Sequence, residues 1–377
     1  MAETKKTTKS TSVVRKINGE IKKLKSKKFK FMFFVYDTKG APNGSLSYIY
    51  NTAYLLKKMG YNVEMLYSEK DFAGVGSWMH KRYAELPHHN IETDGINVSP
   101  SDFLIIPEAL PSVMNQTNRK LPCKRIVLLS NYRYMIDTIQ PGVYWENYGI
   151  RDCITSTKKL EDKIKSVYPN MRAFTVRPMV SSVFKADGRP KKAIVNLICK
   201  DPSDASYIIN EFYWKYPAYK WVAFQNIRNI PMSDMADALK DSFLTIWADS
   251  KTGFGEAALD AMYAGNVVVG KIPESSPDWM TDNENALRYN GLWCYDLDSM
   301  PELIAGVVQS FLSNQIPSEV YDNANKTVSE YLSQKMEEDI QKVYIDGFIN
   351  ERLKEFQIAL DIAKKQNNKA TTIEEKK

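Results

Sequence analysis

The sequence predicts an α/β protein with two Rossmann-like, doubly wound parallel-sheet domains that face a cleft. Short apolar runs alternate with amphipathic segments along most of the chain, as in proteins whose parallel strands are joined by helices. This alternation occurs in two successive sets of similar size. The length of 377 residues is enough for two hydrophobic cores of roughly 150 residues each.

The first set begins with a continuous apolar run over residues 30–36, which is typical of a buried parallel strand. Residues 37–44 contain the breakers of a turn, and a helix is expected from there to Gly60. With a strand over residues 61–67, these segments form a βαβ unit. Further strands are expected over residues 102–106, 125–129, 153–156 and 173–178, and a helix over residues 157–167.

The second set follows a polar segment, residues 181–192, which has the composition of an interdomain linker. Strands are expected over residues 193–198, 221–224, 243–247 and 267–270, with helices over residues 205–216, 232–239 and 255–263. Helical patterns over residues 319–366 finish the chain. We therefore divide it into a basic tail with a short amphipathic helix, two domains and C-terminal helices with a polar tail, over residues 1–27, 28–180, 181–320 and 321–377.

Composition indicates a globular protein and shows no sign of a membrane-spanning or secreted one. Hydrophobic residues make up 44% and charged residues 25%, as in a globular protein. No apolar run approaches the roughly 20 residues of a membrane span, and the N-terminus lacks the apolar core of a secretory signal. The four cysteines lie far apart in sequence, without a CxxC motif. We expect a cytoplasmic protein. A peripheral position at a membrane surface is a further expectation.

The positive charge is concentrated at the N-terminus. Residues 1–30 hold eleven Lys or Arg and two Glu, a net +9, so the rest of the chain is −3 against the total of +6. An apolar stripe runs among these cations at three- and four-residue steps: Val13, Val14, Ile17, Ile21 and Leu24. It favours a helix over residues 13–30 that docks on an anionic membrane surface. The alternatives are a stripe that packs on the first domain, and a tail that contacts nucleic acid.

The most specific motif spans residues 252–265, where a glycine turn opens a helix after a buried strand. Free N–H groups and the helix dipole favour a phosphate at such a turn. Asp260, further along the helix, is placed to accept hydrogen bonds from a ribose diol. Simple packing of the strand against the helix is the alternative interpretation of the glycines.

The whole motif resembles the signature of the GT-B glycosyltransferases of the family-4 type. The residues in register are Gly253, Phe254, Gly255, Leu259, Ala261, Met262 and Gly265. The resemblance extends over most of residues 30–320. It implies a GT-B fold with C-terminal helices crossing back onto the first domain, a nucleotide-sugar donor held by the second domain, an acceptor held by the first, and transfer with retention.

This sequence departs from the signature at two places. The family's paired glutamates fall on Thr252 and Asp260, so one carboxylate is missing, and Glu256 or Asp249 is the candidate replacement. The family's Arg and Lys that hold the diphosphate fall on Lys200 and on Ala205, so one cation is missing as well. The resemblance thus implies catalytic roles for Lys200, Asp260 and Glu256. It implies donor binding by Gly253, Phe254, Gly255, Thr252 and Asp249.

The facing wall of the cleft is expected from loops that follow first-domain strands. Its candidate residues are Gly40, Gly44, Glu108 and Asn131, with solvated loops as the alternative for the last two. No convincing cluster of metal ligands appears, so neither a metal nor another cofactor is expected. The leaving diphosphate would be neutralised by Lys200 and backbone dipoles.

Three functions follow from these observations. The first is a metal-independent glycosyltransferase with a nucleotide-sugar donor and a glycan or lipid-linked acceptor. The second is a glycosyltransferase acting on nucleic acid bases, for which the basic tail would contact phosphates. The third is a non-catalytic GT-B protein that binds or scaffolds, suggested by Thr252 and Ala205.

Overall fold

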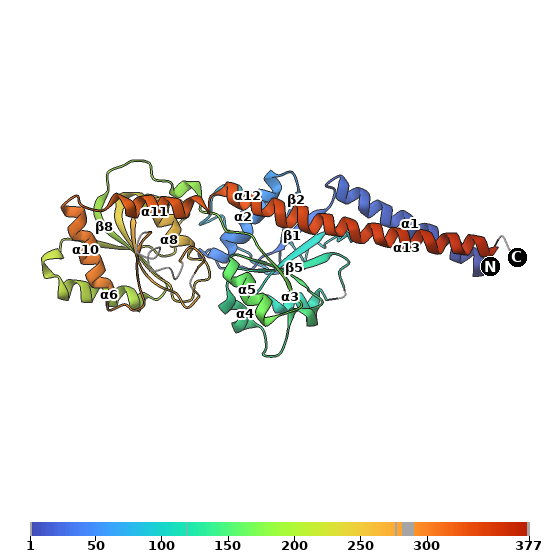
Figure 1. Cartoon of the computed structure of the whole chain (residues 1–377), viewed down its shortest axis with the longest axis horizontal. Coiled ribbons are helices and arrows are strands. Elements are labelled where there is room, and N and C mark those ends of the chain that lie inside the picture. The colour runs from blue at the N-terminus through green and yellow to red at the C-terminus, as the bar shows by residue number, and fades with distance from the viewer. Residues whose placement is uncertain (1, 119, 276, 281–289, 375–377) are drawn as a thin grey trace.

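The computed structural model describes all residues except 1, 119, 276, 281–289 and 375–377. It contains two parallel sheets, one in each half of the chain (Figure 1). The first sheet has the strand order β3-β2-β1-β4-β5-β6-β7 and the second β12-β11-β10-β8-β9. Both orders reverse direction within the sheet, as doubly wound folds do, which confirms the predicted fold class.

The strands of the first sheet are β1 (Lys30–Phe34), β2 (Asn62–Tyr67), β3 (His88–Asn90), β4 (Phe103–Pro107), β5 (Lys124–Leu129), β6 (Asp152–Thr155) and β7 (Arg172–Thr175). The helices of this half are α2 (Gly44–Lys58), η1 (Lys81–Tyr83), α3 (Pro111–Gln116), α4 (Tyr132–Thr138), η2 (Trp145–Tyr148) and α5 (Lys158–Val167). Side chains of β1 alternate between two cores. Phe31 and Phe33 enter one, and Met32 and Phe34 enter the other, so the sheet is covered on both faces.

The strands of the second sheet are β8 (Lys192–Cys199), β9 (Ala223–Asn226), β10 (Ser242–Ala248), β11 (Val267–Lys271) and β12 (Leu292–Cys294). The helices of this half are η3 (Ser182–Phe184), α6 (Pro202–Lys215), η4 (Pro217–Tyr219), α7 (Met232–Asp241), α8 (Glu256–Tyr263), α10 (Met300–Leu312) and α11 (Ser318–Ser329). The segment expected to be a polar linker is anchored, because Phe184 is buried in a core of the second domain.

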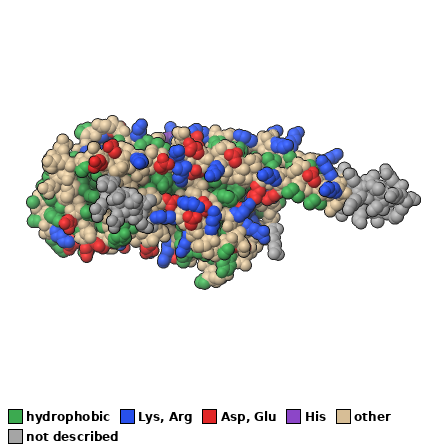
Figure 2. All heavy atoms as spheres, viewed as in Figure 1, with side chains coloured by type: hydrophobic (Ala, Val, Ile, Leu, Met, Phe, Trp, Pro, Cys, Tyr) green, Lys and Arg blue, Asp and Glu red, His purple; other side chains and the backbone are tan. Residues whose placement is uncertain are grey.

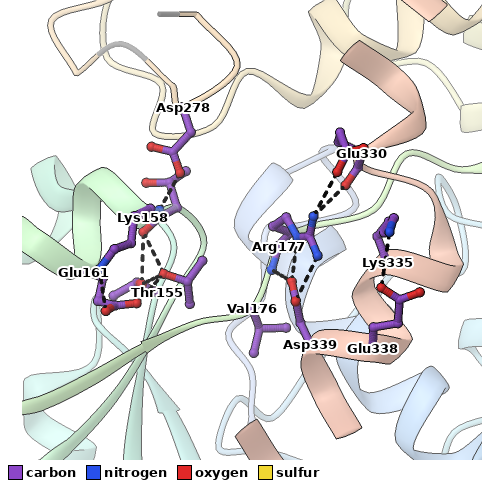
Figure 3. A network of polar contacts seen from close by, with 12 residues as sticks. Thr155, Lys158, Glu161, Val176, Arg177, Asp278, Glu330, Lys335, Glu338 and Asp339 are labelled. Carbon is purple, nitrogen blue, oxygen red and sulfur yellow. Dashed lines mark hydrogen bonds and ion pairs between the residues drawn. The ribbon is translucent and has the colours of Figure 1, made fainter. Parts of the chain in front are cut away.

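The C-terminal helices cross back onto the first domain, as the resemblance implied. They are α12 (Ser333–Ile340), the π-helix η5 (Gln341–Ile349) and α13 (Asn350–Glu374). Met336, Tyr344 and Phe348 from these helices are buried in the first-domain core. At the crossing, Arg177 Nε lies 2.7 Å from an Asp339 carboxylate oxygen, and the same guanidinium approaches Glu330 (Figure 3).

A second polar contact joins the domains on the other side of this crossing. Asp278, in a second-domain loop, accepts hydrogen bonds from the backbone N–H groups of Lys158 and Lys159 (Figure 3). These residues form the first turn of α5, whose free N–H groups favour a carboxylate. The second domain thus supplies a capping group to a helix of the first.

The N-terminal segment differs from its prediction. Residues 2–25 form one helix, α1 (Ala2–Lys25), which begins well before the short helix expected over residues 13–30. Helix α1 packs along α13, and together they project from the first domain (Figure 1). The apolar stripe faces this contact at its inner end, because Ile21 and Leu24 are buried, whereas Val13 remains 47% exposed. Much of the stripe therefore has an intramolecular partner.

Among the described residues, we find no helix with the length and apolar character needed to cross a membrane.

Candidate functional site

A cavity of about 270 Å³ lies between the two domains. The first domain contributes Gly44, from the first turn of α2, and Trp78, from the loop after β2. The second domain contributes residues from several loops and from α8: Lys200, Arg228, Asp249, Thr252, Glu256 and Asp260. An adjoining cavity of about 190 Å³ shares part of this wall and extends to Asn131 and Lys251. Both lie at the carboxyl ends of the strands, where open parallel sheets bind ligands.

The second sheet places two of these residues at its switch point. Lys200 directly follows β8 and Asp249 directly follows β10, and these neighbouring strands are where the strand order reverses. Lys200 N–H donates to Ala248 O at 3.0 Å, which fixes its backbone, while its side chain is exposed at the cavity. Asp249 Oδ1 accepts from Lys251 N–H at 3.1 Å and shapes the loop that leads into the glycine turn.

The glycine turn is constrained on both sides. Gly255 has φ +77° and is the N-cap of α8, and a Cβ on it would lie 2.9 Å from the Trp279 ring. Its N–H donates to Thr252 Oγ1 at 3.2 Å, so the Thr252 hydroxyl closes the turn. Phe254 accepts from Trp279 Nε1 at 2.8 Å through its carbonyl oxygen, and its ring packs edge-on against Tyr331. The ring of Phe254 therefore belongs to the core, and only its backbone borders the site.

Gly253 brings the two domains into contact. A Cβ at this position would clash with the carbonyl oxygen of Ser130, in the loop after β5 of the first domain. Next to it, Asn131 Nδ2 donates to Lys251 O at 2.9 Å, across the domain boundary. The Asn131 Oδ1 accepts from Arg133 N–H at 2.9 Å and caps α4. Both residues build the interface beside the cavity.

Two carboxylates one turn apart on α8 face the cavity. Asp260 is 5% exposed, and its Oδ1 has no hydrogen-bond partner among the described residues. Burial raises the pKa of Asp260 well above its ordinary value, and the charge of Glu256 raises it further. Burial also raises the pKa of Glu256. A Cβ on Gly44 would lie 3.5 Å from Glu256 Oε2, so this carboxylate reaches the start of α2.

Comparisons with known proteins identify the architecture. No family model and no curated protein matches this chain. Among solved structures, the pneumococcal O-GlcNAc transferase GtfA in complex with UDP and GlcNAc matches with a TM-score of 0.64 and 8% identity, covering 86% of this chain and 99% of that one. Sucrose-phosphate synthase from Thermosynechococcus elongatus matches with a TM-score of 0.59 and 11% identity, covering 85% and 99%. The chain has the GT-B fold.

A third GT-B match is an α-glucosyltransferase in complex with UDP and a 13-mer DNA containing a HMU base. Its TM-score is 0.55 and its identity 14%, and the match covers 86% of this chain and 99% of that one. At such identities the comparisons establish the fold alone.

Two residues predicted for the cleft lie outside both cavities of this GT-B protein. Gly40 has φ +78° in the turn after β1, and a Cβ there would lie 3.1 Å from Ser77 Oγ. Glu108 follows β4 and is buried, at 1% exposed. Its Oε1 accepts from Ser130 N–H at 3.1 Å, Ser130 Oγ at 2.8 Å and Asn131 N–H at 2.8 Å. Burial raises the pKa of Glu108 to about 7. Glu108 therefore holds the loop after β5 and does not face the cavity.

The sequence analysis missed several residues of the GT-B cavities, among them two cations and a tryptophan. Arg228 follows β9, Lys251 follows β10, and Trp78 comes from the first domain. Ala205, where the family's Lys falls, is buried in the second-domain core and offers no cation. Arg228 and Lys251 each offer a cation at the cavities. Their position soon after strands of the second sheet was a signal available in the sequence, because that is the ligand edge of a parallel sheet.

No group of three or more His, Cys, Asp or Glu side chains in the described part of the chain is arranged to hold a metal ion.

Proposed function

We propose that this protein is a glycosyltransferase that moves a sugar from a nucleotide-sugar donor to a glycan or lipid-linked acceptor. The observation that carries the proposal is the buried Asp260 carboxylate, whose Oδ1 is unpartnered, among the described residues, at an interdomain cavity of a GT-B fold. Buried polar groups are almost always hydrogen-bonded, so an unpartnered one beside a cavity points to a ligand that supplies the donor. The hydroxyl groups of a ribose or a hexose supply such donors.

The donor would lie against the second domain. Its diphosphate would be held by Lys200 and the N-terminal end of α8 after the glycine turn, where backbone N–H groups and the helix dipole favour negative charge. Arg228 would compensate for the cation missing at Ala205. Asp260 would accept from the donor's hydroxyl groups, and Glu256, from the adjacent turn, would replace the carboxylate absent at Thr252.

The chemistry proposed is transfer with retention and without metal. As the sugar–phosphate bond breaks, negative charge grows on the leaving diphosphate, and fixed cations and backbone dipoles stabilise it there. In a retaining reaction of this kind, the acceptor attacks from the face that the phosphate leaves. The leaving phosphate can then accept the acceptor's proton, so no separate protein base is needed.

The basic helix α1 is the feature from which we infer the class of acceptor. Exposed cations extend along it, among them Arg15, Lys16, Lys22 and Lys25, and Lys and Arg gather on this projecting part of the face in Figure 2. Because Ile21 and Leu24 are buried, we propose that α1 contacts an anionic membrane through its cations and not through its stripe. Each cation near such a surface contributes about 1 kcal/mol.

A second candidate function is transfer to nucleic acid bases. Because the inner end of the stripe is buried, the cations dominate the free surface of α1, and they suit phosphates as well as lipid headgroups. One GT-B structure similar to this chain is an α-glucosyltransferase that holds DNA. The non-catalytic alternative rests on Ala205 and Thr252, and it predicts donor binding without turnover.

Calorimetry with UDP-glucose, UDP-N-acetylglucosamine and GDP-mannose tests the donor, and release of free nucleotide tests turnover. Lys200→Ala should reduce turnover more than it reduces affinity for the bare nucleoside. Lys220→Ala is the matched control, because Lys220 is an exposed second-domain lysine away from both cavities. A wild-type protein that binds no nucleotide sugar would refute the proposed function.

Co-sedimentation with anionic and neutral liposomes, beside a salt titration with duplex DNA, separates the acceptor classes. The comparison is between the wild type and a full-length variant carrying Lys16→Gln, Lys22→Gln and Lys25→Gln. Loss of anionic-liposome binding in the variant supports the membrane proposal. Tight, salt-sensitive DNA binding without liposome binding supports nucleic acid as the acceptor.

A further inference from the structure

Trp78 lies in a first-domain loop that is fixed by hydrogen bonds and by packing in the core. Its backbone N–H donates to Val75 O at 3.2 Å, and Met79 N–H donates to the same oxygen at 2.8 Å. Val75, Trp78 and Met79 are all buried in the first-domain core. Ser77 Oγ also donates to Gly40 O at 3.5 Å, which joins this loop to the turn after β1. The loop is therefore a fixed part of the first domain.

The backbone of Trp78 also contacts the second domain. Its carbonyl oxygen accepts from Met232 N–H at 2.8 Å, at the first residue of α7. The N-cap of α7 is Pro231, whose side chain cannot cap the helix, so the Trp78 carbonyl satisfies one of the free N–H groups there. This hydrogen bond places Trp78 beside the donor half of the site.

Trp78 forms part of the wall of the 270 Å³ cavity, together with Lys200, Glu256 and Asp260. It is 5% exposed, and its Nε1 has no hydrogen-bond partner among the described residues. A buried tryptophan N–H usually finds an acceptor, because leaving it unpaired costs free energy. An acceptor atom of a ligand in the cavity would satisfy it.

We propose that Trp78 donates its indole N–H to an oxygen atom of the bound nucleotide-sugar, so that the first domain recognises the donor held by the second. This inference rests on the proposed function. The indole N–H is a neutral donor, and the phosphate and hydroxyl oxygens of a nucleotide-sugar are acceptors. A donor that contacts both domains also stabilises the arrangement in which Trp78 and Met232 are joined.

The test compares Trp78→Phe with Trp221→Phe. The first variant keeps an aromatic ring and the backbone carbonyl but removes the N–H. The second removes an indole that is 50% exposed in the second domain. Calorimetry uses whichever of UDP-glucose, UDP-N-acetylglucosamine and GDP-mannose the wild type binds most tightly. We expect about tenfold weaker binding for Trp78→Phe, equivalent to about 1.4 kcal/mol, and no change for Trp221→Phe.

Tryptophan fluorescence adds a readout that a purely structural role would not change. Donor binding should alter the emission of the wild type and of Trp221→Phe, and the change should be smaller in Trp78→Phe, where Trp247 is the tryptophan that still lines this cavity among the described residues. Equal affinity and an equal fluorescence change in Trp78→Phe would overturn the inference while leaving the proposed function intact. Failure of the wild type to bind any of the three donors would overturn both.

Discussion

Glu108 and Asp260 are buried carboxylates near the same interdomain cavity, and they differ in what their oxygen atoms contact. In the first domain, Glu108 Oε1 accepts three hydrogen bonds from Ser130 and Asn131. Its Oε2 has no partner among the described residues, but Glu108 lines neither cavity. In the second domain, Asp260 Oδ1 has no partner among the described residues and its side chain borders the cavity. One carboxylate shapes a loop, whereas the other borders the cavity and is proposed to bind the donor. Glu108 follows a parallel strand, and Asp260 lies inside the signature motif. These positions in the sequence do not by themselves distinguish the two roles.

The largest expected effect tests this difference directly. Asp260→Ala should weaken nucleotide-sugar binding by about 1.5–3 kcal/mol, roughly 10- to 150-fold, because it removes the oxygen atoms proposed to accept hydrogen bonds from the donor's hydroxyl groups. Glu108→Gln should change affinity less than about twofold, since the carbonyl oxygen of the introduced amide can accept the same bonds. Calorimetry with the donor measures both variants. Equal losses in the two would mean that the comparison between them is wrong.

A smaller effect is expected where the two domains touch. Gly253→Ala should destabilise the protein by about 1–3 kcal/mol, because the added methyl group meets the Ser130 carbonyl oxygen and forces the domains apart. Gly44→Ala is the control, since its Cβ makes an ordinary contact at 3.5 Å from Glu256. Chemical denaturation measures both. A Gly253→Ala protein as stable as wild type would show that the interface relaxes freely.

The pH dependence of stability should report on the buried Glu108. The folded pKa of Glu108, about 7, lies above its ordinary value of 4.5, so the folded state holds the proton more tightly. Its contribution is fully present below about pH 4.5 and is lost as pH rises through 7. Glu108→Gln should remove this loss and raise Tm at about pH 8 by about 2–4 °C for each kcal/mol recovered. Thermal melts across this pH range measure the effect, and an unchanged slope in the variant would contradict it.

The smallest effect is expected from chelation. Activity should survive EDTA unchanged, because Lys200, Arg228 and the start of α8 are proposed to neutralise the diphosphate. Nucleotide release with and without EDTA, and with added Mn²⁺ or Mg²⁺, measures this. Strict dependence on added metal would refute the assignment of charge neutralisation to these residues.

The sequence predicted the fold well where burial dictates the pattern. Strands buried on both faces appear as continuous apolar runs, so β1 and β10 were recognised within a few residues. The edge strand β3 was missed, because residues 88–90 are polar and are typical of a loop. It pairs with β2, and His88 Nε2 lies 2.8 Å from Tyr50 Oη. A polar edge strand gives no periodic signal.

The site was predicted only in part. The glycine turn, Asp260 and Lys200 were found because they lie in one motif or directly after one strand. Trp78 was not, because it comes from a loop distant in sequence that reaches the second domain only after the domains have assembled. Glu108 was predicted to lie at the cleft because it follows a strand that was predicted correctly. The direction in which its carboxylate points depends on its hydrogen bonds with Ser130 and Asn131. Such partners are a property of tertiary structure.

The pairing of α1 with α13 has a practical consequence. The two helices run together to one pole of the molecule, so the start of α1 and the end of α13 lie near each other and away from the cleft (Figure 1). An affinity tag, a fluorophore or a tether attached beyond either helix is thus held at a distance from the cleft. A protein immobilised by this pole would present its cleft to the solution, where ligands can reach it.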